Sequence, residues 1–403
     1  MSDEEKESGV FPTGEIIVID VVGAALPTRS RTAKDETVDM RLLRTISEVV
    51  PADLPPISKL GIETALAASA EATKSAVSSD LDCWRDWCRE DGCPTLPAAV
   101  EDLVRYVNAL DARGLKPATL ARRIASIASV HRMVGLIEGD VAPTDAPMVR
   151  AALKAVRRRR GALQRQAAPL RLGKALDAQV TKGFTLAALL GACDGDLQGL
   201  RDAALLSLGY DAGLRVSELT AVEERQIDPH EDGSGTLFIP FSKTDQDGEG
   251  AWAWLSAETM RHVRAWQDAS GIAEGPLFRR VGVDRRRARD TEPERALAQT
   301  TYTIGTAPLS RQGVNGIYRR VALAAYDRGL VALPAGDLQG AIQALSTHSL
   351  RVGLTQDLFA AGEDGVGIAQ ALRWSSPATA LRYGRKLAVR SNVAARVLAK
   401  ARR

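Results

Sequence analysis

The chain of 403 residues is too long for one ordinary domain and suits two or three. Its residues are 45% hydrophobic and 26% charged, which excludes a chain that is disordered throughout, and an aromatic content of only 4% favours packed helices over β-sandwiches. Lysine and arginine outnumber aspartate and glutamate by 53 to 50, which gives a net charge of +3. So small a surplus does not by itself indicate an anionic partner, but a local cluster of basic residues does.

Residues 1–57 are predicted to be a flexible extension. They begin with the acidic sequence MSDEEKES, which lacks the features of a signal peptide, and they end in a stretch with Pro51, Pro55 and Pro56. The apolar run at 15–22 suits a short strand, but a mobile tail with one apolar segment is the preferred interpretation. Because no apolar run approaches the length of a bilayer span, we expect a cytoplasmic protein without a membrane anchor.

Residues 58–166 are predicted to form a small helical domain that ends in a basic linker. Apolar residues recur with helical spacing over 75–91, 95–114 and 116–136. A basic bridge follows, and it contains Arg157, Arg158, Arg159, Arg160 and Arg171. A run of this kind is commonly a solvated face, but its place between two folded domains suits a strap over phosphates.

Residues 167–403 are predicted to form a larger α+β domain. The sequence at 200–222 indicates two helices separated by a glycine, and 235–241 and 251–256 indicate two strands joined by a polar turn. Helices follow to the C-terminus, interrupted by a basic loop at 279–295, and four apolar residues at helical spacing predict a terminal helix: Val389, Val393, Val397 and Leu398. The expected fold class is therefore mainly α with a small antiparallel β-sheet.

The sequence predicts catalysis without a metal or a nucleotide cofactor. The four histidines are scattered, the four cysteines have neither zinc-site nor redox-motif spacing, and there is no phosphate-binding loop of the GxxxxGK[ST] type. Any reaction is therefore expected to depend on side chains alone.

Polar and aromatic residues of the second domain follow an order that suits a phosphodiester site. Two guanidiniums can hold the non-bridging oxygens and stabilise a pentacoordinate transition state, and a tyrosine can attack phosphorus once it is deprotonated. A lysine on a hairpin can protonate the departing 5′-oxygen, a histidine can move the tyrosine proton, and a tryptophan N–H can donate a hydrogen bond. The candidate catalytic residues are Arg215, Glu218, Lys243, His348, Arg351, Trp374 and Tyr383.

This order resembles the pattern of the tyrosine recombinase (phage integrase) family, which runs Arg, Lys, His-x-x-Arg, His or Trp, and then Tyr. Glu218 matches the accessory acid of the family, and tryptophan at position 374 is typical of its Cre-like members. The resemblance extends over residues 81–403. It implies a helical, SAM-like core-binding domain before an α+β catalytic domain that breaks and rejoins DNA without metal or ATP.

The resemblance also implies a function and partners. Tyr383 would attack a DNA phosphate to give a 3′-phosphotyrosine and a free 5′-hydroxyl, and two rounds of exchange would pass through a Holliday junction. The expected partners are double-stranded DNA with a specific inverted-repeat site and three further copies of the chain, in a tetramer on two sites joined by the terminal helix. The expected setting is the nucleoid of a bacterium, with a bacterial, phage or plasmid gene.

Two helices are expected to contact DNA. Positions in 116–136 match residues of the family that face the major groove, and the helix that begins near 311 resembles a second groove helix. Each of these residues is alternatively a phosphate contact without sequence preference. With the arginines of the bridge, the candidate DNA-binding residues are Thr119, Arg122, Arg123, Arg132, Arg157, Arg158, Arg159, Arg160, Arg311 and Gln312.

Two other functions remain open at the level of sequence. A type IB topoisomerase or telomere resolvase uses the same chemistry, and a catalytically silent DNA-binding regulator can have the same fold. The presence of Tyr383, Arg215 and Arg351 favours an active enzyme over the regulator.

Overall fold

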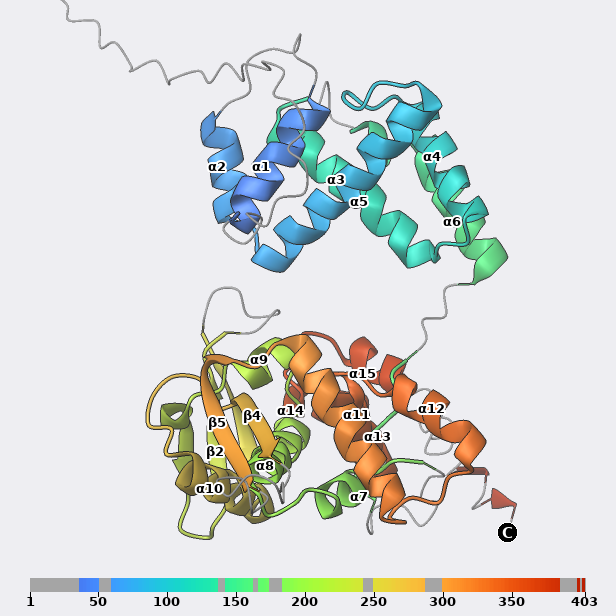
Figure 1. Ribbon diagram of the computed structural model, residues 1–403. Helices are drawn as coiled ribbons and strands as arrows, with labels where there is room; N and C mark the ends of the chain where they lie inside the picture. Colours follow the sequence, from blue (N-terminus) through green and yellow to red (C-terminus); the bar gives the residue numbers. More distant parts are fainter. Residues whose placement is uncertain are drawn as a thin grey trace, which may run out of the picture. The chain divides into compact units, whose positions relative to one another are not determined.

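The computed structural model describes residues 36–50, 59–136, 142–161, 166–173, 183–241, 249–286, 299–384, 397–398 and 401–402. The chain divides into two compact units, Met1–Gln164 and Arg165–Arg403, each of which has its own core. The mainly helical fold with small antiparallel sheets that the sequence predicts is confirmed (Figure 1). The expected strand at 15–22 lies outside the described residues.

Helices form unit 1, and two neighbouring clusters of apolar side chains hold it together. Trp84 and Trp87 stack at the centre of one cluster and Tyr106 packs against both, with ring centroids 4.9–5.3 Å apart. The helical elements of unit 1 are α1 (Val38–Val49), α2 (Lys59–Ala67), α3 (Glu71–Asp91), α4 (Val100–Ala112), α5 (Pro117–Met133), the 3₁₀ turn η1 (Pro143–Asp145) and α6 (Pro147–Arg160).

Helix α1 corrects the prediction of a flexible extension for residues 38–49, whereas residues 1–35 and 51–57 lie outside the described residues. The side chain of Thr37 accepts a hydrogen bond from the Met40 amide and begins the helix, which packs against α3. Leu42 and Ile46 on its apolar face are buried in the second cluster together with Leu81 of α3. The helix is amphipathic, and its apolar stripe is stable only because α3 covers it.

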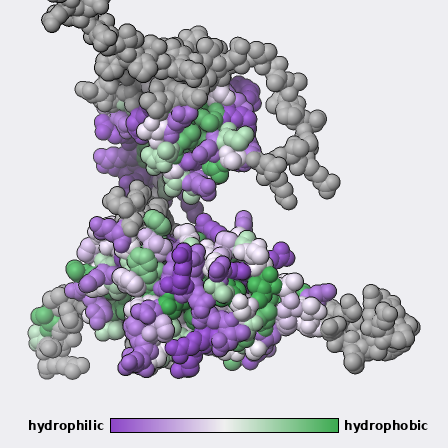
Figure 2. Space-filling view, turned by 90° about the vertical axis from the view of Figure 1, so that its left-hand side faces the viewer, coloured by the Kyte–Doolittle hydropathy of each residue, from purple (hydrophilic) through white to green (hydrophobic). Residues whose placement is uncertain are grey.

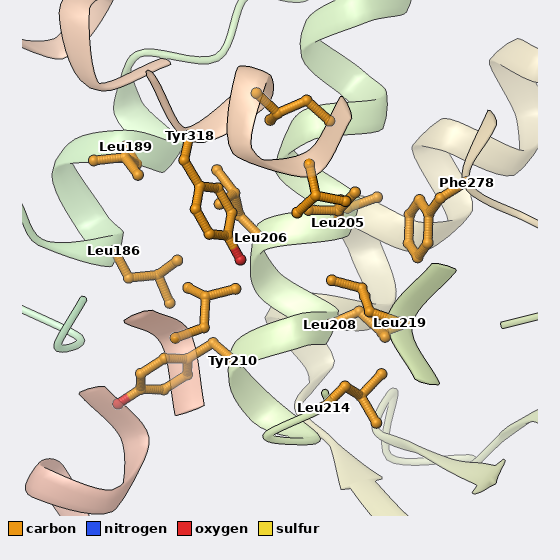
Figure 3. Packing of buried hydrophobic residues seen from close by; sticks show 14 of the residues in the cluster. Leu186, Leu189, Leu205, Leu206, Leu208, Tyr210, Leu214, Leu219, Phe278 and Tyr318 are labelled. Atoms are coloured by element: carbon orange, nitrogen blue, oxygen red, sulfur yellow. The ribbon is translucent and has the colours of Figure 1, made fainter. Parts of the chain in front are cut away.

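Unit 2 is built around helix α8 (Leu197–Asp211), in which every residue from 201 to 210 is buried. Figure 3 shows Leu205, Leu206, Leu208 and Tyr210 of this helix among apolar side chains of the surrounding elements. Most of these residues are apolar, as a helix buried on all sides requires, and its two buried charges, Arg201 and Asp202, pair with each other at 2.6 Å. The other helical elements of unit 2 are α7 (Leu186–Gly191), α9 (Val216–Thr220), η2 (Glu224–Gln226), α10 (Ala257–Ser270), α11 (Arg311–Asp327), α12 (Ala335–Ala344), α13 (Ser349–Ala360), α14 (Gly365–Ala371) and α15 (Pro377–Tyr383).

Two antiparallel sheets lie beside these helices. β2 (Gly235–Ile239) and β3 (Ala251–Leu255) pair as predicted, and the short strand β1 (Ile227–Pro229), which the sequence analysis did not predict, adds to the edge of β2. The prediction of a basic loop at 279–295 is wrong for residues 279–286. Residues Arg279–Arg286 form β4 and pair with β5 (Gln299–Pro308), because Val281 and Val283 alternate with polar residues and cover the core.

An extended segment at 166–173, here called the lead-in segment, lies against α13. The amide of Leu170 donates to the Ser349 carbonyl at 2.9 Å, and the Arg171 guanidinium donates to Asp357 at 2.6 Å. The Tyr210 hydroxyl donates to the same carboxylate at 2.5 Å, and burial next to Asp357 raises the pKa of Tyr210. Arg171 is therefore a buried ion-pair partner, and the expectation that it belongs to an exposed basic bridge is wrong.

Figure 2 shows hydrophilic and hydrophobic residues interspersed over the visible face of each unit. Among the described residues, no helix has the length and apolar character needed to cross a bilayer.

A buried histidine gives unit 1 a predicted pH dependence. Nδ1 of His131 hydrogen-bonds the Ile127 carbonyl at 2.9 Å, and Nε2 accepts the Ala98 amide at 3.0 Å, so the neutral ring satisfies both partners. Burial lowers the pKa of His131 below 6.5, so the unfolded chain binds more protons than the folded chain. The free energy of unfolding should therefore decrease as the pH falls below 6.5, by at most about 1.4 kcal/mol per pH unit.

The matched experiment compares wild type with His131→Gln in urea unfolding between pH 7.5 and 5.0, followed by tryptophan fluorescence. On acidification, the free energy of unfolding should fall more steeply in the wild type than in His131→Gln, because only the wild type has the buried histidine. Equal pH dependence of the two proteins would contradict the assignment.

Candidate active site

Arg215 and Glu218 meet where helix α9 begins. Arg215 occupies the N-cap position, and the carboxylate of Glu218, one turn later, accepts its backbone amide at 2.9 Å and its Nη1 at 2.7 Å. The Glu218 side chain is buried, whereas the Arg215 side chain keeps 18% of its surface exposed. The carboxylate therefore fixes the arginine and leaves part of its guanidinium open to an anion.

Arg351 is buried on the first turn of α13 and joins two loops. One guanidinium nitrogen donates to the Gly213 carbonyl, in the loop before α9, and the other donates to the Leu372 carbonyl, after α14, at 2.5 Å. Burial, and next the charge of Arg215, lower the pKa of Arg351 to about 9, so it remains a cation at neutral pH. The sequence spacing alone does not place it beside Arg215, but the fold does.

Trp374 and Tyr383 stack beside Arg351. Their ring centroids are 5.2 Å apart with an interplanar angle of 14°, and the Arg351 guanidinium lies 5.0 Å from the centroid of the indole. Tyr383 is the last residue of α15, and its backbone carbonyl accepts a hydrogen bond of 3.4 Å from Gln166 of the lead-in segment. A cation, an indole and a phenol thus form one column, held by stacking and cation–π attraction.

His348 lies at the N-cap of α13, three residues before Arg351, and is exposed. Partial desolvation, followed by the charges of Arg311, Arg351 and Arg215, lowers its pKa below 6.5. The ring is therefore neutral at pH 7 and able to accept a proton.

Lys243 follows strand β2 in the sequence and lies outside the described residues, so its position relative to this cluster stays a prediction. The other six candidate catalytic residues lie in unit 2, within or just before helices α9, α13 and α15. Contacts between these helices and the loops beside them bring the residues together.

The structure adds Arg373, which the sequence analysis missed. Its guanidinium lies 3.6 Å from Glu218, and its backbone has a φ of +54°. The sequence shows an arginine next to Trp374, but a positive φ at a residue other than glycine has no sequence signal.

The candidate DNA contacts on α5 differ in availability. Arg132 is exposed and Thr119 is half-buried. Arg122 is also exposed, although it donates to the buried carboxylate of Asp80 at 2.6 Å. Arg123 has only 16% of its side chain exposed, lies 3.7 Å from Asp80 and donates to a tyrosine hydroxyl of α4, so it is largely engaged within unit 1.

The four consecutive arginines form the last turn of helix α6, which corrects the expectation that they lie in a linker. Arg157, Arg158, Arg159 and Arg160 are all exposed. Arg159 pairs with Asp111 of α4 at 2.7 Å, and Arg160 pairs with the same carboxylate. The first two arginines are thus more available to phosphates than the last two.

The remaining candidates lie at α11 and at the C-terminus. Arg311 and Gln312 are the first residues of α11 and are exposed. Val397 and Leu398 are exposed, with 55% and 49% of their surface accessible, whereas Val389 and Val393 lie outside the described residues.

Comparison with known families settles the classification. Residues 179–389, more than half of the chain, match the phage integrase family, and residues 62–134 match the N-terminal SAM-like domain of phage integrases. The chain belongs to the phage integrase family. The cluster of Arg215, Arg351 and Tyr383 lies within the first of these matches.

Among individual relatives, this integrase-family chain is 27% identical to the recombinase Cre of Escherichia phage P1 over 334 residues, which cover 82% of the chain and 89% of Cre. It is 33% identical over 219 residues to an integrase/recombinase XerD homologue of Selenomonas ruminantium, and that match covers 53% of the chain and 60% of the homologue. The second match thus spans less than two thirds of that relative.

Solved structures show the same fold. The integrase-family chain superposes with a TM-score of 0.51 on the XerH site-specific recombinase bound to palindromic difH substrate, at 12% identity, over 88% of this chain and 94% of XerH. The Tn1549 transposon integrase in complex with transposon right end DNA also gives 0.51, at 14% identity, over 86% of this chain and 94% of that one. At this level of identity the likeness concerns the fold alone.

Proposed function

We propose that this protein is a tyrosine-type site-specific DNA recombinase that cleaves and rejoins duplex DNA through a 3′-phosphotyrosine intermediate. The observation that carries the proposal is the column of Arg351, Trp374 and Tyr383 next to the pair of Arg215 and Glu218. These groups supply a nucleophile and two guanidiniums, which is what phosphoryl transfer without a metal requires.

In the proposed reaction Tyr383 loses its proton and attacks phosphorus, a bond forms between the phenolic oxygen and phosphorus, and the bond to the 5′-oxygen breaks. His348 is neutral and takes up the proton of Tyr383, and Lys243 gives a proton to the 5′-oxygen. Arg215 and Arg351 hold the non-bridging oxygens. A 5′-hydroxyl from a second duplex then attacks the phosphotyrosine, giving its proton to Lys243. The bond between Tyr383 and phosphorus breaks, and the phenolate regains its proton from His348. Two such rounds produce exchange through a Holliday junction.

The proposed partners are a specific inverted-repeat DNA site and further copies of the chain in a tetramer on two sites. The DNA contacts that the geometry favours are Thr119 and Arg132 on α5, Arg157 and Arg158 on α6, and Arg311 and Gln312 on α11. Four further candidates are less available because carboxylates of unit 1 hold them: Arg122, Arg123, Arg159 and Arg160. We further propose that the protein acts at the nucleoid of a bacterial host.

The test is formation of a covalent protein–DNA adduct. A bound site is first selected from a randomised duplex library with the full chain and is then made as a nicked duplex, so that the cleaved fragment dissociates and the intermediate accumulates. Wild type should form an adduct stable to denaturant, with the DNA mapped to Tyr383 by peptide mass spectrometry. No adduct on a site that the protein binds would indicate a DNA-binding regulator. An adduct with plasmid relaxation but no exchange between two sites would indicate a topoisomerase.

Replacement of Arg215 by alanine should slow cleavage by about 10²- to 10³-fold, because it removes a charge that stabilises the transition state. DNA affinity should change much less, since many other phosphate contacts remain. The measurement is the single-turnover rate of adduct formation on the nicked duplex, with Arg225→Ala as the control. Arg225 is an exposed arginine outside the cluster, paired with Glu223. A wild-type rate for Arg215→Ala would contradict the assigned role.

A further inference from the structure

Arg373 has an unfavourable backbone conformation at the centre of the candidate site. Among the described residues it is the one residue other than glycine with a positive φ, at +54° between α14 and α15. An L-residue with a side chain occupies this left-handed region at a cost in free energy, and such conformations persist where the surrounding structure imposes them, often at functional sites.

The side chain of Arg373 reaches the carboxylate that orients Arg215. Only 9% of the side chain is exposed, and its Nη2 lies 3.6 Å from Oε2 of Glu218. The same oxygen accepts the backbone amide of Arg215 at 2.9 Å, while Oε1 accepts the Arg215 guanidinium at 2.7 Å. Glu218 is therefore shared by two arginines, and one of them, Arg215, keeps part of its side chain exposed.

The described charges of this cluster do not cancel. Arg215, Arg351 and Arg373 contribute three positive charges and Glu218 one negative charge, which leaves a net charge of +2. Burial lowers the pKa of Arg373, and its proximity in turn contributes to the lowered pKa of Arg351, so the guanidiniums repel one another. A phosphodiester attacked by a phenolate has a charge of −2, which would relieve this repulsion in the transition state more than in the bound substrate.

We propose that Arg373 is a positioning residue for DNA cleavage, which holds Glu218 in place against Arg215 and raises the positive charge of the site to match the dianionic transition state. The inference rests on the proposed recombinase function. A purely structural role is a weaker explanation, because glycine would adopt this backbone without strain and would avoid burying a charge.

The substitution that tests the inference is Arg373→Gly, which relieves the backbone strain and removes the guanidinium. The single-turnover rate of adduct formation should fall about 10- to 100-fold, because Arg215 is less well oriented. The DNA dissociation constant should stay within about twofold of wild type. Arg373→Lys, which keeps the charge, should recover part of the lost rate.

A second comparison shows whether Arg373 acts through Glu218. In a Glu218→Gln background, Arg373→Gly should slow adduct formation by a smaller factor than it does in the wild-type background, because the carboxylate that Arg373 positions is already gone. Equal losses in both backgrounds would overturn the proposed route of action.

The outcomes separate this inference from the proposed function. If wild type forms no adduct, the recombinase assignment itself fails. If wild type forms the adduct and Arg373→Gly forms it equally fast, or loses DNA binding together with cleavage, the inference about Arg373 alone is overturned. A slower rate with retained DNA binding supports it.

Discussion

Tyr383→Phe is expected to abolish the covalent adduct completely while leaving the protein folded and able to bind DNA. Phenylalanine keeps the ring that stacks on Trp374 with centroids 5.2 Å apart, so the column next to Arg351 should persist. What is lost is the phenolic oxygen, without which no bond to phosphorus can form. The measurement is denaturing electrophoresis of protein incubated with the nicked duplex, together with a DNA-binding titration of the same preparation.

The matched control for this variant is Tyr326→Phe. Tyr326 is a half-buried tyrosine on α11 that lies outside the cluster, so removal of its hydroxyl should leave adduct formation at the wild-type level. An undiminished adduct with Tyr383→Phe would mean that another residue is the nucleophile. A loss of DNA binding equal to the loss of adduct would mean that the hydroxyl has a structural role.

Gly353→Ala is expected to destabilise unit 2 by about 3 kcal/mol, which makes it the largest single effect that we predict on stability. A β-carbon at position 353 would lie 1.8 Å from the carbonyl oxygen of Leu170 in the lead-in segment. The clash is with backbone, so rotation of a side chain cannot relieve it, and the segment must move away from α13. The hydrogen bond from Leu170 to Ser349 and the ion pair of Arg171 with Asp357 would be strained with it.

Gly340→Ala is the control for this substitution. Gly340 lies within α12, and nothing lies within 4 Å of the position that its β-carbon would occupy. Alanine should stabilise that helix by roughly 0.5–1 kcal/mol. Urea unfolding of the full chain measures both variants. Similar stability of Gly353→Ala and Gly340→Ala would contradict the close packing of the lead-in segment against α13.

Much of the candidate site is predictable from the sequence because it depends on short spacings. His348 and Arg351 are three residues apart at the start of one helix, and Arg215 and Glu218 are three apart at the start of another. An N-cap residue and the residue three positions after it lie side by side at the first turn of a helix whatever the rest of the fold does. The confirmed fold class has a similar origin, since helical periodicity and alternation of apolar residues are local patterns.

Two of the predictions that were wrong concern segments whose structure depends on a partner outside the segment. Helix α1 at Val38–Val49 is stable because α3 covers its apolar face, and strand β4 exists because β5 pairs with it. The partner of α1 is two helices away and that of β4 is the next strand, but the composition of either segment does not reveal its partner and indicated an extension and a loop.

By itself, the sequence determined which chemical groups the protein has and in what order: a tyrosine, arginines, a histidine and a tryptophan, without a metal-binding motif. The tertiary structure decided how those groups are used. It paired Arg123, Arg159 and Arg171 with carboxylates and placed Arg373 beside Glu218. The reason is physical. An arginine side chain is long and charged, and its partner is set by whichever carboxylate or phosphate the folded backbone brings within a few ångströms.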